Sequence, residues 1–205
     1  MVNDVILIAA SALAGSVPSA YILVRIFLHE DIRKTGSGNS GTTNTFRTMG
    51  LKGAVPVFMF DFLKGFVPVW IALHSGFAFY LPVKVLAAIV GIAALLGHVF
   101  SAFIGGKGGK GMATGAGFFS ALCPLLFPVC LAVFIPVLAL SRRMSVASMA
   151  AAVSLPLLYL AILYFTGESA EWYLVALSFL VPVLILAKHR KNILRLREGT
   201  EKPLF

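Results

Sequence analysis

The sequence predicts an all-α, polytopic integral membrane protein, and three observations support this prediction. Of the 205 residues, 59% are hydrophobic and 12% are charged, which is about half the usual charged share of a soluble domain. The mean hydropathy is +0.94. Apolar runs recur along the whole chain, and several approach the roughly 20 residues that a helix needs to cross a bilayer. Since no polar segment is long enough to fold separately, we expect a single membrane-embedded domain over residues 1–205.

The apolar runs define the expected spans. They cover residues 4–27, 54–73, 81–104, 112–140, 146–166 and 172–187. The run 112–140 is too long for one ordinary span, and it contains Pro124 and Pro128 near its middle. If this run forms two short spans that turn near residues 123–128, the chain has seven transmembrane helices.

The basic residues favour seven spans over six. They gather in four segments, which lie within residues 33–52, 107–110, 142–143 and 188–202. Only the seven-span topology places all four segments on one side, as the positive-inside rule expects of the cytoplasmic side. We therefore expect the N-terminus outside and the C-terminus in the cytoplasm. The same clustering explains the net charge of +9 without nucleic acid as a partner.

Residues 36–47 read GSGNSGTTNTFR, and their composition is typical of an anion-binding loop. Glycine lets backbone N–H groups converge on an anion, and short polar side chains add further hydrogen bonds. The loop residues expected to bind substrate in this way are Ser37, Gly38, Asn39 and Asn44. Arg47 ends the stretch with a planar guanidinium that suits a phosphate. The alternative is a flexible Gly/Ser linker, and the order of residues is not that of a Walker A motif.

A second glycine-rich segment, GGKGGKG, occupies residues 105–111. Its two lysines, Lys107 and Lys110, bring two ammonium groups close to several backbone amides, and lysine is an effective point-charge partner for phosphate. The following GMATG resembles a helix start, whose positive end also favours an anion. The alternative is that the two lysines only set the membrane topology.

The last two basic segments carry further candidates. Ser145 follows two arginines in RRMSVAS, where it is a candidate anion ligand or a helix N-cap. His189 and Asn192 are three residues apart in the C-terminal segment, so they share one face if the last helix continues. The alternative for this tail is contact with anionic membrane lipid.

Three of the ionisable residues at or within the expected spans are candidates for a specific role. His98 ends the third span, where it is either an interfacial anchor or a group that exchanges protons near neutral pH. Asp61 and Lys64 lie within the second span and are spaced to pair on one helix face. We expect this pair to hold a helix end beneath the glycine-rich loop. The two cysteines, Cys123 and Cys130, show no metal-binding or disulfide spacing.

Five segments together resemble one family closely. They are GSVPSAYIL at 15–23, DIRKTGSGNSGTTNTFR at 31–47, DFLKG at 61–65, GHVFSAFIGGKGGKGMAT at 97–114 and HRKNILRLREGTEK at 189–202. In order and spacing the chain resembles the bacterial membrane-bound acyl-phosphate:glycerol-3-phosphate acyltransferases, the PlsY family. The resemblance covers nearly the whole chain, and the combination of the two glycine-rich motifs is highly specific.

The resemblance implies a seven-helix enzyme of the bacterial inner membrane, with its active site on the cytoplasmic face. Such an enzyme transfers a fatty acyl group from acyl phosphate to glycerol-3-phosphate. The products are lysophosphatidic acid and inorganic phosphate, and the reaction begins phospholipid synthesis. The resemblance implies neither a metal nor an organic cofactor. The HxxxxD motif of the soluble-type acyltransferases is missing from this chain.

The resemblance also implies roles for individual residues. The phosphate-binding positions of the family fall on Arg47, Lys107 and Asn192, with Ser145 and His189 beside them. Ser37 and His98 match residues at the reaction centre. Ser37 is better explained as a hydrogen-bond donor than as a covalent nucleophile, because its motif holds no charged base. The general base stays open between His98, His189 and a phosphate oxygen of the substrate.

A transporter or channel for a phosphorylated solute is the competing class, because it would use similar cationic loops. Transporters usually place their binding site near the bilayer midplane, at broken helices of internal repeats. This chain shows no clear repeat, and its polar residues concentrate on one expected membrane face. The sequence therefore favours an enzyme.

Overall fold

The computed structural model of the protein describes residues 1–77 and 79–205, and within them it is all-α, with no strand. Backbone contacts divide the chain into two compact units, Met1–Leu122 and Cys123–Phe205. The first unit holds α1 (Val2–Ser16), α2 (Ser19–Leu28), α3 (Thr42–His74), α4 (Val83–Val99) and α5 (Met112–Leu122). The second holds α6 (Leu126–Ser141), α7 (Met144–Thr166), α8 (Trp172–Lys188) and α9 (Arg190–Arg197). The single domain expected over residues 1–205 stays a prediction.

Four helical segments of the described chain are long and apolar enough to cross a membrane. They are Val2–Leu28, Thr42–His74, Val83–Ile104 and Met144–Thr166. The pair α8 and α9, bent by 61°, gives a fifth candidate, while α5 and α6 are apolar but shorter. The expectation that the run 112–140 forms two helices is confirmed, because α5 and α6 are separated by residues 123–125.

The first apolar run, residues 4–27, is expected as one span, and in the structure it consists of two helices. α1 ends at Ser16 and α2 begins at Ser19, with Val17 at φ −57° and ψ 116° between them. The cause is Pro18, which has no backbone N–H and disfavours helical geometry in the residue before it. The carbonyls at the end of α1 therefore need partners outside the helix.

The prediction that all of 36–47 is loop is wrong for its second half. α3 begins at Thr42, so Asn44 and Arg47 lie on a helix. This helix is interrupted at Gly50, whose φ of 66° and ψ of −159° are outside the helical region. Only glycine adopts that conformation readily. The short segment 42–49 therefore takes a direction separate from the apolar part of α3.

Close backbone approaches hold the helices of the first unit together. A Cβ atom on Gly15 of α1 would collide with the carbonyl oxygen of Ala94 on α4, and one on Gly97 of α4 would collide with that of Ala12. Small residues at these crossings allow the tight packing that is typical of membrane helices. α3 packs in the same way on α5, where a Cβ on Gly65 would meet Thr114.

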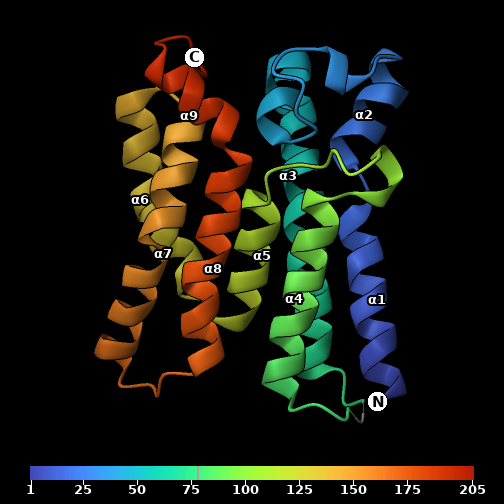
Figure 1. Cartoon of the computed structure of the whole chain (residues 1–205), viewed down its shortest axis with the longest axis vertical. Helices are drawn as coiled ribbons and strands as arrows, with labels where there is room; N and C mark the ends of the chain where they lie inside the picture. The colour runs from blue at the N-terminus through green and yellow to red at the C-terminus, as the bar shows by residue number, and fades with distance from the viewer. Residues whose placement is uncertain (78) are drawn as a thin grey trace. The chain divides into compact units, whose positions relative to one another are not determined.

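The polar loops of the first unit lie at one end of its helices. In Figure 1, the loop between α2 and α3 lies at the end opposite the N-terminus, and the loop between α4 and α5 lies at the end of α4 that faces the same way. Each loop includes a short 3₁₀ helix, Ile32–Lys34 in the first and Ala102–Ile104 in the second.

The second unit is also polar at one end, where its tail folds back. The C-terminal residues return to the turn between α6 and α7, and Leu204 N–H donates to the Arg142 carbonyl at 2.7 Å. In Figure 1 the C-terminus lies at the same end of this unit as α9.

Candidate functional site

The polar loop before α3 begins with a pair of charged side chains. Arg33 donates to both carboxylate oxygens of Asp31, at 2.9 Å from Nε and 2.7 Å from Nη2. Its guanidinium lies over the Tyr21 ring, 5.0 Å from the centroid. The hydrogen bonds from Arg33 lower the pKa of Asp31 to about 2. Arg33 therefore holds the loop through Asp31 and Tyr21.

Asn44 closes this loop from inside. Its side-chain oxygen accepts the Ser37 N–H at 2.8 Å, and its amide nitrogen donates to the carbonyls of Ile32 and Thr35, both at 3.0 Å. These bonds use both amide hydrogens. Asn44, expected to bind substrate, therefore gives the loop its shape.

The two glycine-rich segments lie side by side. Ser40, which is buried, donates its hydroxyl to the Lys107 carbonyl at 3.2 Å. This bond joins the first loop to the segment 105–111, across 67 positions of sequence. The side chain of Lys107 is exposed, whereas Lys110 and Arg47 are partly buried. Arg47 lies on the second turn of α3, within six residues of Gly41, where the loop enters the helix.

The remaining loop candidates differ in their exposure. Ser37 and Asn39 are partly buried, and Gly38 is exposed with a φ of 71°. Ser37 is held through its backbone N–H, as described above, so its backbone lies close to the first turn of α3. The Ser37 hydroxyl is a hydrogen-bond donor on this anchored backbone.

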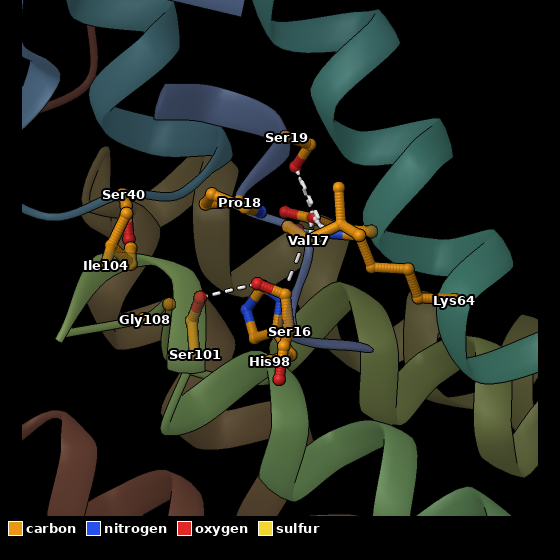
Figure 2. A pocket seen from close by; sticks show the side chains of 12 residues that line it. Ser16, Val17, Pro18, Ser19, Ser40, Lys64, His98, Ser101, Ile104 and Gly108 are labelled. Atoms are coloured by element: carbon orange, nitrogen blue, oxygen red, sulfur yellow. Dashed lines mark hydrogen bonds and ion pairs between the residues drawn. The ribbon is translucent and has the colours of Figure 1, made fainter. Parts of the chain in front are cut away.

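A small cavity lies between the two loops, lined by Ser40 and segment 105–111 and by residues of α1, α2, α3, α4 and the turn after α4. Figure 2 shows the His98 ring beside Ser16 and Ser101, with Gly108 nearby. Asp61 and Lys64 also line it, and they form an ion pair with 2.7 Å between Nζ and Oδ1. The Lys64 ammonium donates as well to the Val17 carbonyl at the break between α1 and α2. The expectation that this pair holds a helix end beneath the loop is confirmed.

The segment 105–111 is built directly on the end of α4. Gly109 N–H donates to the His98 carbonyl at 3.1 Å, and Gly106 N–H donates to the Ser101 carbonyl at 2.8 Å. A Cβ atom on Gly109 would collide with His98 Nε2. Glycine is therefore required at 109 because the histidine ring fills the space where a side chain would start. His98 itself is buried.

The second unit carries a separate polar cluster around Glu201. Its carboxylate oxygen Oε1 accepts from the Ser145 hydroxyl and from the Asn192 amide, both at 2.7 Å. The Arg143 guanidinium donates to the Glu201 carbonyl at 3.1 Å. The side chains of Ser145, Asn192 and Glu201 are all buried. Ser145 and Asn192, expected at a phosphate site, are thus brought together by a carboxylate.

The last helix is not continuous from His189 to Asn192, so the condition under which the two residues would share one face is not met. The helix bends by 61° at His189, between α8 and α9. The His189 ring is buried, and its Nδ1 lies 2.8 Å from the Ile185 carbonyl oxygen. The ring is therefore oriented by the helix that precedes the bend.

Sequence reasoning missed two residues that organise these clusters. The first is Glu201, which in the sequence is only an acid in a basic tail. The glycine two positions before it, Gly199, has a φ of 68° and lies at the turn that brings Glu201 back to α7. The second is Ser40, for which the sequence gives no indication beyond the polar composition of its loop. In the described part of the chain, no group of three or more histidine, cysteine, aspartate or glutamate side chains is placed to hold a metal ion.

Comparisons with known proteins agree on one family. The sequence model for glycerol-3-phosphate acyltransferase matches residues 5–199. A protein of Geobacter sulfurreducens with that name is 42% identical over 201 residues, covering 98% of this chain and 97% of the relative. One from Endomicrobium trichonymphae, with the same name, is 42% identical over 204 residues, covering 100% of this chain and 97% of the relative.

Two solved structures are also similar over nearly the whole chain. Both are crystal structures of PlsY, an integral membrane glycerol 3-phosphate acyltransferase, at 32% identity, covering 98% of this chain and 95% of that one. The glycerol 3-phosphate form matches with a TM-score of 0.86, and the lysophosphatidic acid form with 0.83.

Proposed function

Because the chain belongs to the glycerol-3-phosphate acyltransferase family and is a membrane acyltransferase, we propose that it acylates glycerol-3-phosphate with a fatty acyl phosphate. The products are lysophosphatidic acid and inorganic phosphate, and the reaction is the first step of phospholipid synthesis. The forms in which the two similar PlsY structures were solved support the acceptor and the product.

The observation that carries this proposal is the hydrogen bond between Ser40 and Lys107. It joins two glycine-rich segments of the first unit. One segment ends at Arg47, and the other contains Lys107 and Lys110. Backbone amides and cations together suit phosphate groups. Both proposed substrates carry phosphate, so two such loops in contact fit a reaction between them.

In the proposed reaction, the glycerol-3-phosphate hydroxyl oxygen attacks the acyl carbonyl carbon. The new ester bond forms, the bond between carbon and the phosphate oxygen breaks, and the hydroxyl proton ends on the released phosphate. Since acyl phosphate is already activated, positioning supplies much of the acceleration. No metal or organic cofactor takes part in this balance.

The proposed roles follow the chemistry of each group. Arg47 binds phosphate through its planar guanidinium, and Lys107 and Lys110 stabilise the charge of the leaving phosphate. Ser37 donates a hydrogen bond to substrate. Further substrate-binding residues in this proposal are Gly38, Asn39, Ser145, His189 and Asn192. The group that first accepts the proton is His98, His189 or a phosphate oxygen.

We further propose a seven-span topology in the bacterial inner membrane, with the N-terminus outside and the catalytic loops in the cytoplasm. The structure has four long apolar segments and a fifth candidate in the bent pair α8 and α9. In this proposal the shorter apolar helices α5 and α6 also cross the membrane, which makes seven spans. In each unit the basic turns gather at one end, which agrees with the positive-inside rule. Acyl chains reach the enzyme from the surrounding lipid.

A turnover assay tests the proposal. The purified protein in lipid nanodiscs is given glycerol-3-phosphate and palmitoyl phosphate, and both inorganic phosphate and lysophosphatidic acid are measured. We expect the two products in equal amounts and no product when palmitoyl-CoA replaces the acyl phosphate. Binding of glycerol-3-phosphate without release of phosphate would overturn the proposal and favour a transporter.

A further inference from the structure

Asp61 is a buried carboxylate that no step of the proposed reaction uses. It lies on the apolar part of α3 and is 2% exposed. The Ser19 hydroxyl donates to its Oδ1 at 2.5 Å, and the Lys64 ammonium, with 9% of its side chain exposed, lies 2.7 Å from the same atom. Removing two charges from water costs about as much as their attraction returns. A contribution to stability is therefore a weak explanation for this pair.

The contacts of the pair lead toward the end of α4. Lys64 holds the Val17 carbonyl at the break between α1 and α2. One residue earlier, the Ser16 carbonyl accepts the Ser101 hydroxyl at 2.5 Å, and Ser101 follows α4. Figure 2 shows this bond beside the His98 ring. The break in the first span is thus fastened both to α3 and to the end of α4.

His98 connects Asp61 to the loop that carries the two lysines. Its Nδ1 lies 3.7 Å from Asp61 Oδ1, which is too long for a hydrogen bond and leaves an electrostatic interaction. Its Nε2 faces Gly109, where a Cβ atom would collide with it, and its carbonyl accepts the Gly109 N–H. The ring therefore fills the space between a fixed carboxylate and the middle of segment 105–111.

We propose that Asp61 is a positioning residue for the acyl-transfer reaction, acting through His98 on the loop that carries Lys107 and Lys110. This inference rests on the proposed function. The Asp61 charge, fixed by Ser19 and Lys64, orients the histidine ring, and the ring supports Gly109 between the two lysines. Small displacements of charge-stabilising groups lower a rate strongly, since a misplacement of about 1 Å costs on the order of a hundredfold.

A kinetic experiment on Asp61→Asn, which keeps the shape of the side chain and removes its charge, is the first test. We expect kcat/KM for palmitoyl phosphate to fall by about tenfold, while KM for glycerol-3-phosphate changes by less than about twofold. Glu168→Gln, the same chemical change at an exposed carboxylate between α7 and α8, should leave both unchanged. An equal loss against both substrates would overturn the inference.

A second readout shows whether Asp61 acts through His98, and it does not require activity. Limited trypsin cleavage after Lys107 is compared in the wild type, Asp61→Asn, His98→Gln and the double variant, with cleavage after Lys34 as the internal reference. We expect each single variant to raise cleavage after Lys107 relative to Lys34, and the double variant to match His98→Gln. If the increase in cleavage in the double variant equals the product of the two single increases, the two residues act independently and Asp61 does not act through His98.

Two outcomes of these experiments need separate interpretation. If Asp61→Asn does not fold, the same comparisons are made with Ser19→Ala, which removes one hydrogen bond to Asp61 and leaves the charge pair. We expect Ser19→Ala to raise cleavage after Lys107 by less than Asp61→Asn would, and to have no effect when His98→Gln is already present. The same rise from Ser19→Ala with and without His98→Gln would contradict the inference. If the wild type releases no phosphate from palmitoyl phosphate, the proposed function fails, whereas an active wild type with independent effects refutes the positioning role alone.

Discussion

Arg47 and Arg33 lie on opposite sides of the same loop, and their surroundings differ. Arg33 is paired through two nitrogens with Asp31 and lies over Tyr21. Arg47 lies on the short helix after the loop and is partly buried. The sequence already favours Arg47 as the phosphate-binding candidate, because Arg47 ends the glycine-rich stretch and Arg33 lies outside it. The contacts of Arg33 with Asp31 and Tyr21 add that Arg33 holds the loop.

We predict that Arg47→Lys inserts and folds normally but loses most of its turnover. Lysine keeps the positive charge, yet it cannot reproduce the two-nitrogen contact of a guanidinium with phosphate. Losing one charge-assisted hydrogen bond costs about 2 kcal/mol, or roughly thirtyfold in kcat/KM. Initial rates measured against glycerol-3-phosphate concentration should show the deficit.

Arg33→Lys is the control for this prediction. It breaks the two-nitrogen pair with Asp31, so we expect a lower unfolding temperature and a nearly unchanged dependence on glycerol-3-phosphate. If Arg33→Lys has the larger kinetic deficit and Arg47→Lys is near normal, the phosphate-binding role of Arg47 is wrong.

Gly50 is the feature of α3 that matters most at the scale of elements. It separates the helical segment 42–49, which carries Asn44 and Arg47, from the apolar part of α3 that carries Asp61. A Cβ atom at this position would have no neighbour within 4 Å. Any effect of alanine there therefore comes from backbone strain and not from a clash.

We predict that Gly50→Ala destabilises the protein and also lowers activity. A non-glycine residue in this region of φ and ψ costs about 1–3 kcal/mol, and relief of the strain would redirect the segment that carries Arg47. Thermal unfolding in detergent and glycerol-3-phosphate acylation in nanodiscs measure the two effects.

Gly167→Ala provides a matched comparison. Gly167 has a φ of 70° and a ψ of 12°, ends α7, and also has open space around it. We expect a cost of about 1 kcal/mol there, with little change in activity once the protein is folded. Equal kinetic losses in both variants would show that the direction of segment 42–49 does not matter for the reaction.

At the scale of the whole molecule, apolar side chains cover the outer faces of the helices. Phe60, Leu157 and Leu180 are more than half exposed, whereas Asp61, Asn192 and Glu201 are buried. This arrangement is the reverse of a soluble protein and fits a chain surrounded by lipid. Within residues 1–77 and 79–205, the contacts between polar side chains described above lie at the ends of the two units and in the cavity that both loops line.

The proposed topology predicts which positions a membrane-impermeant thiol reagent reaches in intact cells. Cysteines at Lys34, Arg142 and Thr200 should be protected, because all three are exposed in the structure but expected in the cytoplasm. Cysteines at Tyr80 and Ser169, exposed at the other ends of their units, should be labelled.

The experiment uses a protein in which both native cysteines are replaced, Cys123→Ala and Cys130→Ala. Both are free and partly exposed, so they would otherwise react with the reagent. Each protected position should become reactive after the cells are permeabilised, which separates a cytoplasmic location from burial. Labelling at Arg142 without labelling at Lys34 would mean that α5 and α6 do not both cross the membrane.

Much of the fold follows from local sequence. The apolar runs predict most helices because a bilayer requires helices of a minimum length with satisfied backbone groups. The start of α5 after GGKGGKG and the division of 112–140 were both visible in the sequence. The kink at Gly50 and the bend at His189 were not, since a glycine or histidine within a helical stretch does not by itself define a break.

The sequence by itself determined the class of the protein, its family and the residue types that suit phosphate. These depend on composition and on ordered motifs, which are present whether or not the chain is folded. The tertiary structure alone decided how the candidates are connected. Ser40 meets Lys107, Asn44 closes the loop around Ser37, and Glu201 joins Ser145 to Asn192. The physical reason is that a buried polar group must find a partner wherever packing brings one, and helix packing brings together residues that are far apart in the chain.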